Sequence, residues 1–148
     1  MAETDLIKLY SKRILALAAD IPHLGRLDAP MATARRRSPL CGSVVTVDLD
    51  VTDGRIERFA QVKACALGQA AASVVGRNIV GANRETVARA RDQLSAMLKS
   101  GGPVPDAPFE ELEVLRPAAD FANRHASILL SLDATLEAFD SASASACA

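Results

Sequence analysis

The sequence predicts an α+β domain, in which a small antiparallel sheet of about three strands follows an N-terminal helix and several helices pack on one face of the sheet. Two observations lead to this fold class. Apolar and polar residues alternate over residues 45–51, which indicates a half-buried strand, whereas almost everything after Cys65 has helical spacing. Strands that precede most of the helices, rather than alternating with them, are typical of α+β folds.

The N-terminal part is expected to hold one helix and a long loop. Residues 5–19 predict an amphipathic helix, because apolar side chains recur near one of its faces: Leu6, Leu9, Tyr10, Ile14 and Leu17. Residues 21–40 contain three prolines and little periodicity, so a loop is expected there. The third strand is the hardest to place, and residues 32–36 are its expected position.

Two further strands are predicted to form a hairpin. The first has an apolar face made of Val45, Val47, Leu49 and Val51. Asp53-Gly54 follows, a pair of residues typical of tight hairpin turns. The return strand is expected at residues 55–63, where the alternation is weaker.

Helices account for the rest of the chain. The first is expected from Cys65 to about Val80, and a second is expected after Asn83, with the breaker Ser-Gly-Gly-Pro at residues 100–103 ending it. Residues 109–115 predict a short helix. The last helix has the clearest apolar stripe: Phe121, His125, Ile128, Leu129, Leu132, Leu136 and Phe139. We therefore expect one domain over residues 1–140 and a flexible tail of small residues over 141–148.

Composition limits the classes of function. The chain has 148 residues and a net charge of −1, so neither nucleic acid nor an anionic membrane has a general electrostatic attraction for it. No apolar stretch approaches the roughly 20 residues of a membrane span, and no signal peptide is expected. Three cysteines do not suggest a disulfide framework. A reducing, cytoplasmic setting is the better interpretation.

Two cysteines are placed where chemistry is expected. Cys41 sits in a turn between Pro39 and Gly42, directly before a strand, and Cys65 opens a helix of small residues. Thiolate is a soft metal ligand and a strong nucleophile. Free cysteine is also among the most buried residue types, so Cys65 has an alternative interpretation as a core residue. The same alternative is harder to apply to Cys41, because packing alone seldom requires a thiol in a turn.

The order of these motifs resembles the U-type iron–sulfur cluster assembly scaffolds, the NifU, IscU and SufU group. That family has Asn-Pro-x-Cys-Gly-Asp, a hairpin with an Asp-Gly turn, Gly-Cys-(Ala/Ser)-Ile before an Ala-rich helix, and a third cysteine on a late helix. Cys41-Gly42, Asp53-Gly54 and Ala64-Cys65-Ala66-Leu67 follow this order. The long interval after Cys65 is similar to the SufU branch. The resemblance covers nearly the whole chain.

The resemblance implies a shared site of Cys41, Cys65 and His125 that binds zinc or an iron–sulfur cluster, with His125 standing where the third cysteine is expected. Ser38 replaces the family's Asn and Ser43 its metal-binding Asp, so Ser43 is only a weak fourth candidate ligand. Zinc accepts mixed Cys and His ligands, and iron–sulfur clusters accept His in Rieske centres. Cys41 is the expected persulfide acceptor. His125 also has a simpler interpretation, as a buried histidine whose nitrogens are satisfied.

The family also implies partners. A cysteine desulfurase is expected to supply sulfur and apo-proteins to receive the cluster, so the chain is expected to be a scaffold or sulfur-transfer protein, not an enzyme. The alternative is a relative that has lost cluster binding and acts through protein contacts with the assembly machinery. A Cys41–His125 nucleophilic enzyme is a third alternative, but the sequence supplies no oxyanion hole and leaves Cys65 unexplained.

Overall fold

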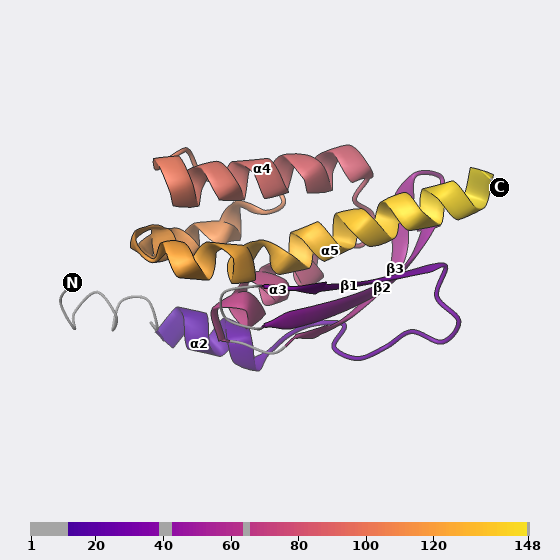
Figure 1. Ribbon diagram of the computed structural model, residues 1–148, viewed down its shortest axis with the longest axis horizontal. Helices are drawn as coiled ribbons and strands as arrows, with labels where there is room; N and C mark the ends of the chain where they lie inside the picture. Colours follow the sequence, from indigo (N-terminus) through magenta and orange to yellow (C-terminus); the bar gives the residue numbers. More distant parts are fainter. Residues whose placement is uncertain (1–11, 39–42, 64–65, 148) are drawn as a thin grey trace.

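The computed structural model describes residues 12–38, 43–63 and 66–147. Within them, the chain forms one α+β unit in which helices cover one face of a three-stranded sheet (Figure 1). The elements are, in order, α2 (Lys12–Ala19), β1 (Ala32–Arg37), β2 (Val44–Thr52), β3 (Arg55–Lys63), α3 (Ala66–Asn78), α4 (Arg84–Ser100), the 3₁₀ helix η1 (Glu110–Asp120) and α5 (Ala122–Cys147). The predicted fold class is confirmed.

The sheet is antiparallel throughout, with the order β1-β2-β3. The hairpin between β2 and β3 turns at Asp53 and Gly54, whose φ angles of 54° and 74° lie in the left-handed region that this dipeptide tolerates well. A register shift between Asp50 and Val51 bends the end of β2. The expected third strand is present as β1, paired with β2 from Ala32↔Leu49 to Arg37↔Val44.

The helices form two levels above the sheet. Helix α5 lies across β1 and β2, α3 packs beside it against β3, and α4 lies on the far side of α5 (Figure 1). The inward faces of the strands supply buried aliphatic residues, among them Val45, Val47 and Leu49. Small residues in α3, Ala70 and Ala71 for example, are also fully buried and allow α5 to approach closely.

Two helical segments differ from expectation. The short helix predicted at residues 109–115 is a longer 3₁₀ helix that extends to Asp120 and contains Pro117. A proline in a helix removes a donor and clashes with the preceding turn, which favours a segment other than a regular α-helix. Helix α5 continues through Cys147, across the residues for which a flexible tail is predicted. Alternating Ala and Ser give this segment enough helix propensity to continue the preceding turns. The first half of the predicted N-terminal helix lies outside the described residues.

The loop between α2 and β1 is fastened to the outward face of the sheet by a buried carboxylate. Asp48 on β2 is fully buried and accepts hydrogen bonds from Arg26 Nε (2.6 Å), from the backbone N–H of Leu27 (3.1 Å) and from the hydroxyl of Thr33 (2.6 Å). Burial alone would raise the pKa of Asp48, but these bonds and the Arg26 charge outweigh it and hold the pKa below its usual value.

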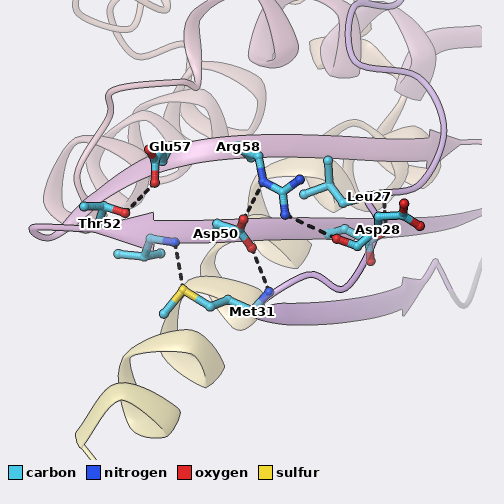
Figure 2. Close-up of polar contacts among 9 residues, drawn as sticks. Leu27, Asp28, Met31, Asp50, Thr52, Glu57 and Arg58 are labelled. Carbon is cyan, nitrogen blue, oxygen red and sulfur yellow. Dashed lines mark hydrogen bonds and ion pairs between the residues drawn. The ribbon is translucent and has the colours of Figure 1, made fainter.

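A second carboxylate on the same strand fastens the end of the loop. Asp50 accepts hydrogen bonds from the backbone N–H of Met31 and from the guanidinium of Arg58, which also reaches the carbonyl oxygen of Asp28 (Figure 2). Burial would raise the pKa of Asp50 as well, but the hydrogen bonds from Met31 and Arg58 and the charge of Arg58 outweigh it and lower the pKa. The two aspartates therefore hold the loop from Arg26 to Met31 against the outward face of the sheet.

A buried amide fastens the start of the same loop. Gln61 on β3 exchanges backbone hydrogen bonds with His23 and Gly25, each 2.9 Å long. Its side-chain Nε2 donates to the carbonyl oxygen of Ala72 in α3 at 2.8 Å, and its Oε1 accepts from the hydroxyl of Ser131 in α5 at 3.0 Å. One residue thus joins the loop, β3, α3 and α5.

No helix in the described part of the chain has both the length and the apolar character that crossing a membrane requires.

The Asp48 contacts predict an acid-sensitive fold. Because the pKa of Asp48 is lower in the folded chain than in the unfolded chain, its stabilisation is complete above the unfolded value of about 4 and is lost as the pH falls through the folded value. Asp48→Asn should lower the free energy of unfolding at pH 7 by about 1–3 kcal/mol and reduce its decline between pH 5 and 2. Denaturant titrations across that range test this; an unchanged acid limb in Asp48→Asn would contradict the assignment.

Gly76 should be intolerant of a side chain. A Cβ there would lie 2.8 Å from Gln61 Nε2, closer than real Cβ contacts, and 3.0 Å from the carbonyl oxygen of Pro22, which is tighter than most of them. Helix propensity alone predicts that Gly76→Ala stabilises α3 by about 1 kcal/mol. We expect the opposite sign, a loss of about 1–3 kcal/mol in the free energy of unfolding, because the crowded side chains must shift. Urea denaturation decides between the two.

Candidate functional site

The first cysteine-bearing segment connects β1 to β2. Ser38 and Ser43 lie at its two ends, where the backbone N–H of Ser38 donates to the carbonyl oxygen of Ser43 at 2.8 Å. Both residues are buried. Cys41 itself lies outside the described residues. Ser43, the weak fourth candidate, is placed at the point where this segment enters β2.

The second cysteine-bearing segment connects β3 to α3. Lys63, the last residue of β3, pairs with Val45 of β2. The preceding residue of β2, Val44, pairs with Arg37, the last residue of β1. Helix α3 begins at Ala66, and Cys65 lies outside the described residues. The described residues that flank both segments therefore belong to one end of the sheet, which we call the Ser38 end.

One face of α5 carries a polar stripe whose middle residue, Ser131, reaches Gln61 of β3. Ser127, Ser131 and Thr135 are spaced four residues apart and are all buried. Ser131 contacts Gln61, and the hydroxyl of Thr135 donates to the carbonyl oxygen of Ser131 at 2.6 Å. Sequence reasoning did not single out this stripe, although its four-residue spacing is visible in the sequence.

His125 lies on a different face of α5. Two residues correspond to about 200° around a helix, so His125 and Ser127 are directed almost oppositely. His125 is 6% exposed, and its Nε2 lies 3.0 Å from the carbonyl oxygen of Ala118 and 3.2 Å from that of Ala119. Both neighbours are hydrogen-bond acceptors, so Nε2 is the nitrogen that carries the hydrogen, and it donates a hydrogen bond to the end of η1. This nitrogen is therefore not available to a metal in the present geometry.

The surroundings of His125 are a shallow cavity of about 460 Å³ between α4, α5 and η1. Arg91, Lys99 and Asp133 also line it. Arg91 Nε donates to Asp133 at 2.8 Å, and this hydrogen bond raises the pKa of Arg91 above its usual value despite partial burial. The cavity lies on the α4 side of α5, whereas Gln61 and the sheet lie on the other.

Of the metal ligands predicted from the sequence, the structure describes Ser43 and His125. Among the described residues, no group of three or more His, Cys, Asp or Glu side chains is arranged to hold a metal ion. Cys41 and Cys65 are outside those residues, so the predicted Cys41, Cys65 and His125 set remains a prediction. Cys147 is the last residue of α5.

The chain is similar to several solved structures. It is 40% identical to the N-terminal part of a nitrogen-fixing NifU-like protein from Brucella abortus, with a TM-score of 0.91 over 95% of this chain and 98% of that one. A hypothetical protein is 24% identical, with a TM-score of 0.78, over 90% and 98% of the two chains. A protein from Fervidobacterium islandicum AW-1, described as an iron–sulfur cluster assembly scaffold for the SUF system, is 16% identical with a TM-score of 0.81, again over 90% and 98%.

Protein-family models and curated proteins give no match to this chain. The identity to the Brucella abortus protein extends over almost the full length of both chains and coincides with a nearly superposable fold. On that ground, the chain belongs to the family of NifU-like N-terminal domains, the U-type iron–sulfur cluster scaffolds.

Proposed function

We propose that this chain is a scaffold on which iron–sulfur clusters are assembled, and that Cys41 and Cys65 are the thiolates that hold the metal and the incoming sulfur. The observation that carries the proposal is the 40% identity to a NifU-like domain over 95% of the chain. The described structure supports it further, because the residues that flank both cysteines belong to the same end of the sheet.

The chemistry needs two thiolates at one place. The thiolate of Cys41 would attack the outer sulfur of a persulfide on a cysteine desulfurase; the sulfur–sulfur bond of the donor breaks, the donor leaves as a thiolate, and Cys41 carries the persulfide. Cys65 would then share the metal with Cys41. Zinc is the ion we propose for the scaffold without a cluster, since it accepts thiolates in a tetrahedral set with an open position. Apo-proteins would receive the finished cluster. We place this work in the cytoplasm, because its reducing conditions keep cysteines as free thiols.

The third ligand is a separate part of the proposal. His125 can bind a metal through Nδ1, or through Nε2 after it leaves the carbonyl oxygens of Ala118 and Ala119. Ser127 lies one helical turn before Ser131, the α5 residue that reaches Gln61, but a hydroxyl stays protonated at neutral pH and is a poor ligand. A site with two thiolates and exchangeable further ligands suits transfer better than storage.

The placement of His125 also favours a second candidate function. If His125 stays on the α4 side and Ser43 replaces a carboxylate, the site has fewer ligands than the family pattern. The chain would then bind the assembly machinery without holding a cluster. Metal content distinguishes this candidate from the first.

The cysteine pair predicts metal content. Protein purified without oxygen should contain close to one equivalent of zinc, or iron with acid-labile sulfide after reconstitution. Cys41→Ser and Cys65→Ser should each lose most of it, because a serine hydroxyl does not replace a thiolate. Cys147→Ser is the matched control and should keep the content of the parent chain. A parent chain that stays free of metal after reconstitution would leave the second candidate standing.

The third ligand can be tested on the same helix. If His125 binds the metal, His125→Ala should lower the zinc or cluster content and change the absorption of a cobalt-substituted site, whereas Ser127→Ala should not. If His125 only donates to the end of η1, His125→Ala should lower the free energy of unfolding by about 1 kcal/mol and leave the cobalt spectrum unchanged. That second pattern would remove His125 from the ligand set.

A further inference from the structure

The run Arg35-Arg36-Arg37 is divided by the pleat of β1. Successive side chains of a strand point to opposite faces, so Arg35 and Arg37 share the outward face and Arg36 belongs to the other. The partners agree with this division. Arg36 pairs with the buried Val45 and reaches Glu137 of α5 at 4.0 Å. The three charges, adjacent in the sequence, therefore lie on two opposite faces of the sheet.

The outward arginines belong to a defined patch at the Ser38 end. Arg37 pairs with Val44, Arg35 pairs with Thr46, and Thr46 pairs in turn with Val62 of β3. Val62 is 43% exposed, although it is a large aliphatic residue on a strand. We call these five residues the basic face: Arg35, Arg37, Val44, Thr46 and Val62.

The charge of the basic face is not compensated by the described residues. Farther along the same side of the sheet, Arg26 is paired with Asp48 and Arg58 with Asp50. Neither Arg35 nor Arg37 has a carboxylate within ion-pair distance among the residues that the structure describes. Two positive charges beside an exposed valine favour a protein surface that is acidic and partly apolar.

The position of the basic face indicates which protein would bind to it. Its strands lead directly into the two segments that carry Cys41 and Cys65, so a protein that delivers sulfur to Cys41 must approach the Ser38 end. We propose that the basic face is the docking surface for the sulfur donor, a cysteine desulfurase that presents acidic and apolar residues beside its own reactive cysteine. This inference rests on the proposed function and adds to it the surface and the chemistry of the partner.

Two other occupants fit the same face less well. A second copy of this chain would bring the four outward arginines of two basic faces together, and like charges repel. A nucleic acid would need a larger field than two arginines provide in a chain with a net charge of −1.

The chain offers a matched control for the charged part of the basic face. Arg35→Glu and Arg37→Glu make the same charge change as Arg36→Glu, one residue away and on the opposite face. Binding of each variant to a purified cysteine desulfurase would be measured by calorimetry at low and at moderate salt. We expect Arg35→Glu and Arg37→Glu to weaken binding about tenfold at low salt and less at moderate salt, because salt screens exposed charges. Arg36→Glu should change the dissociation constant less than twofold.

The apolar part has its own control, because Val62 and Val80 are similarly exposed, at 43% and 49%. Val62→Ser should weaken desulfurase binding several-fold at any salt concentration, and Val80→Ser should not. Circular dichroism and metal content of every variant show whether the fold and the cysteine site are kept.

Equal binding by all the variants would overturn the docking surface, and so would a parent chain that does not bind the desulfurase. Equal binding by all the variants leaves the proposed function intact, because that function is decided by the metal and sulfide content of the parent and of the cysteine variants. A parent chain that does not bind the desulfurase would also remove the sulfur-delivery step proposed for Cys41, but not the metal site. Conversely, a chain that binds the desulfurase through Arg35 and Arg37 but holds no metal would keep the docking surface and overturn the cluster site.

Discussion

The arrangement of the helices over the sheet depends on the hydrogen bonds of Gln61. Its backbone holds the loop at His23 and Gly25, while its amide bonds to the carbonyl oxygen of Ala72 and to the hydroxyl of Ser131. A buried amide without partners is costly, so the position of β3 fixes the positions of α3 and α5 relative to it. Because Cys65 lies between β3 and α3 in the sequence, the same bonds determine where the two ends of its segment are.

The interior around this amide is built mostly from aliphatic and small side chains. Only 3% of the residues are aromatic, and α3 presents alanines where another protein would have larger side chains. Short side chains bring the backbones close together, which lets a single glutamine reach both α3 and α5. The same closeness leaves no room at Gly76. A core of this kind gains its density from tight approach of elements rather than from large rings.

Elements with a strong periodic pattern were predicted well. The alternation of β2, the Asp53-Gly54 turn, and the start of α4 after Asn83 with its end at the breaker of residues 100–103 each follow from local residues, and the structure has all three. Strand β1 was placed correctly, although its three arginines give it little apolar pattern; its pairing with β2 is what makes it a strand. The 3₁₀ form of η1 and the extension of α5 could not be predicted, because both depend on packing and continuity with neighbouring turns.

The candidate site was less accessible to sequence reasoning. A family motif places His125 in a ligand position by order along the chain, but order does not determine which way a helix residue points. That direction is set by the contacts of α5 as a whole, with Gln61 on one side and Arg91 on the other. The spacing of Ser127, Ser131 and Thr135 is visible in the sequence, but that Ser131 meets the buried amide of Gln61 is visible only in the structure.

The arginines of β1 have one more consequence, which concerns solubility. Strand β1 is at the edge of the sheet, and no further strand pairs with it among the described residues. An open strand edge is a template for pairing between chains and so for aggregation. Three consecutive guanidinium groups at that edge would set six positive charges against one another if two copies met there. The arginines of β1 therefore disfavour pairing between two copies of the chain at this edge, next to the Ser38 end.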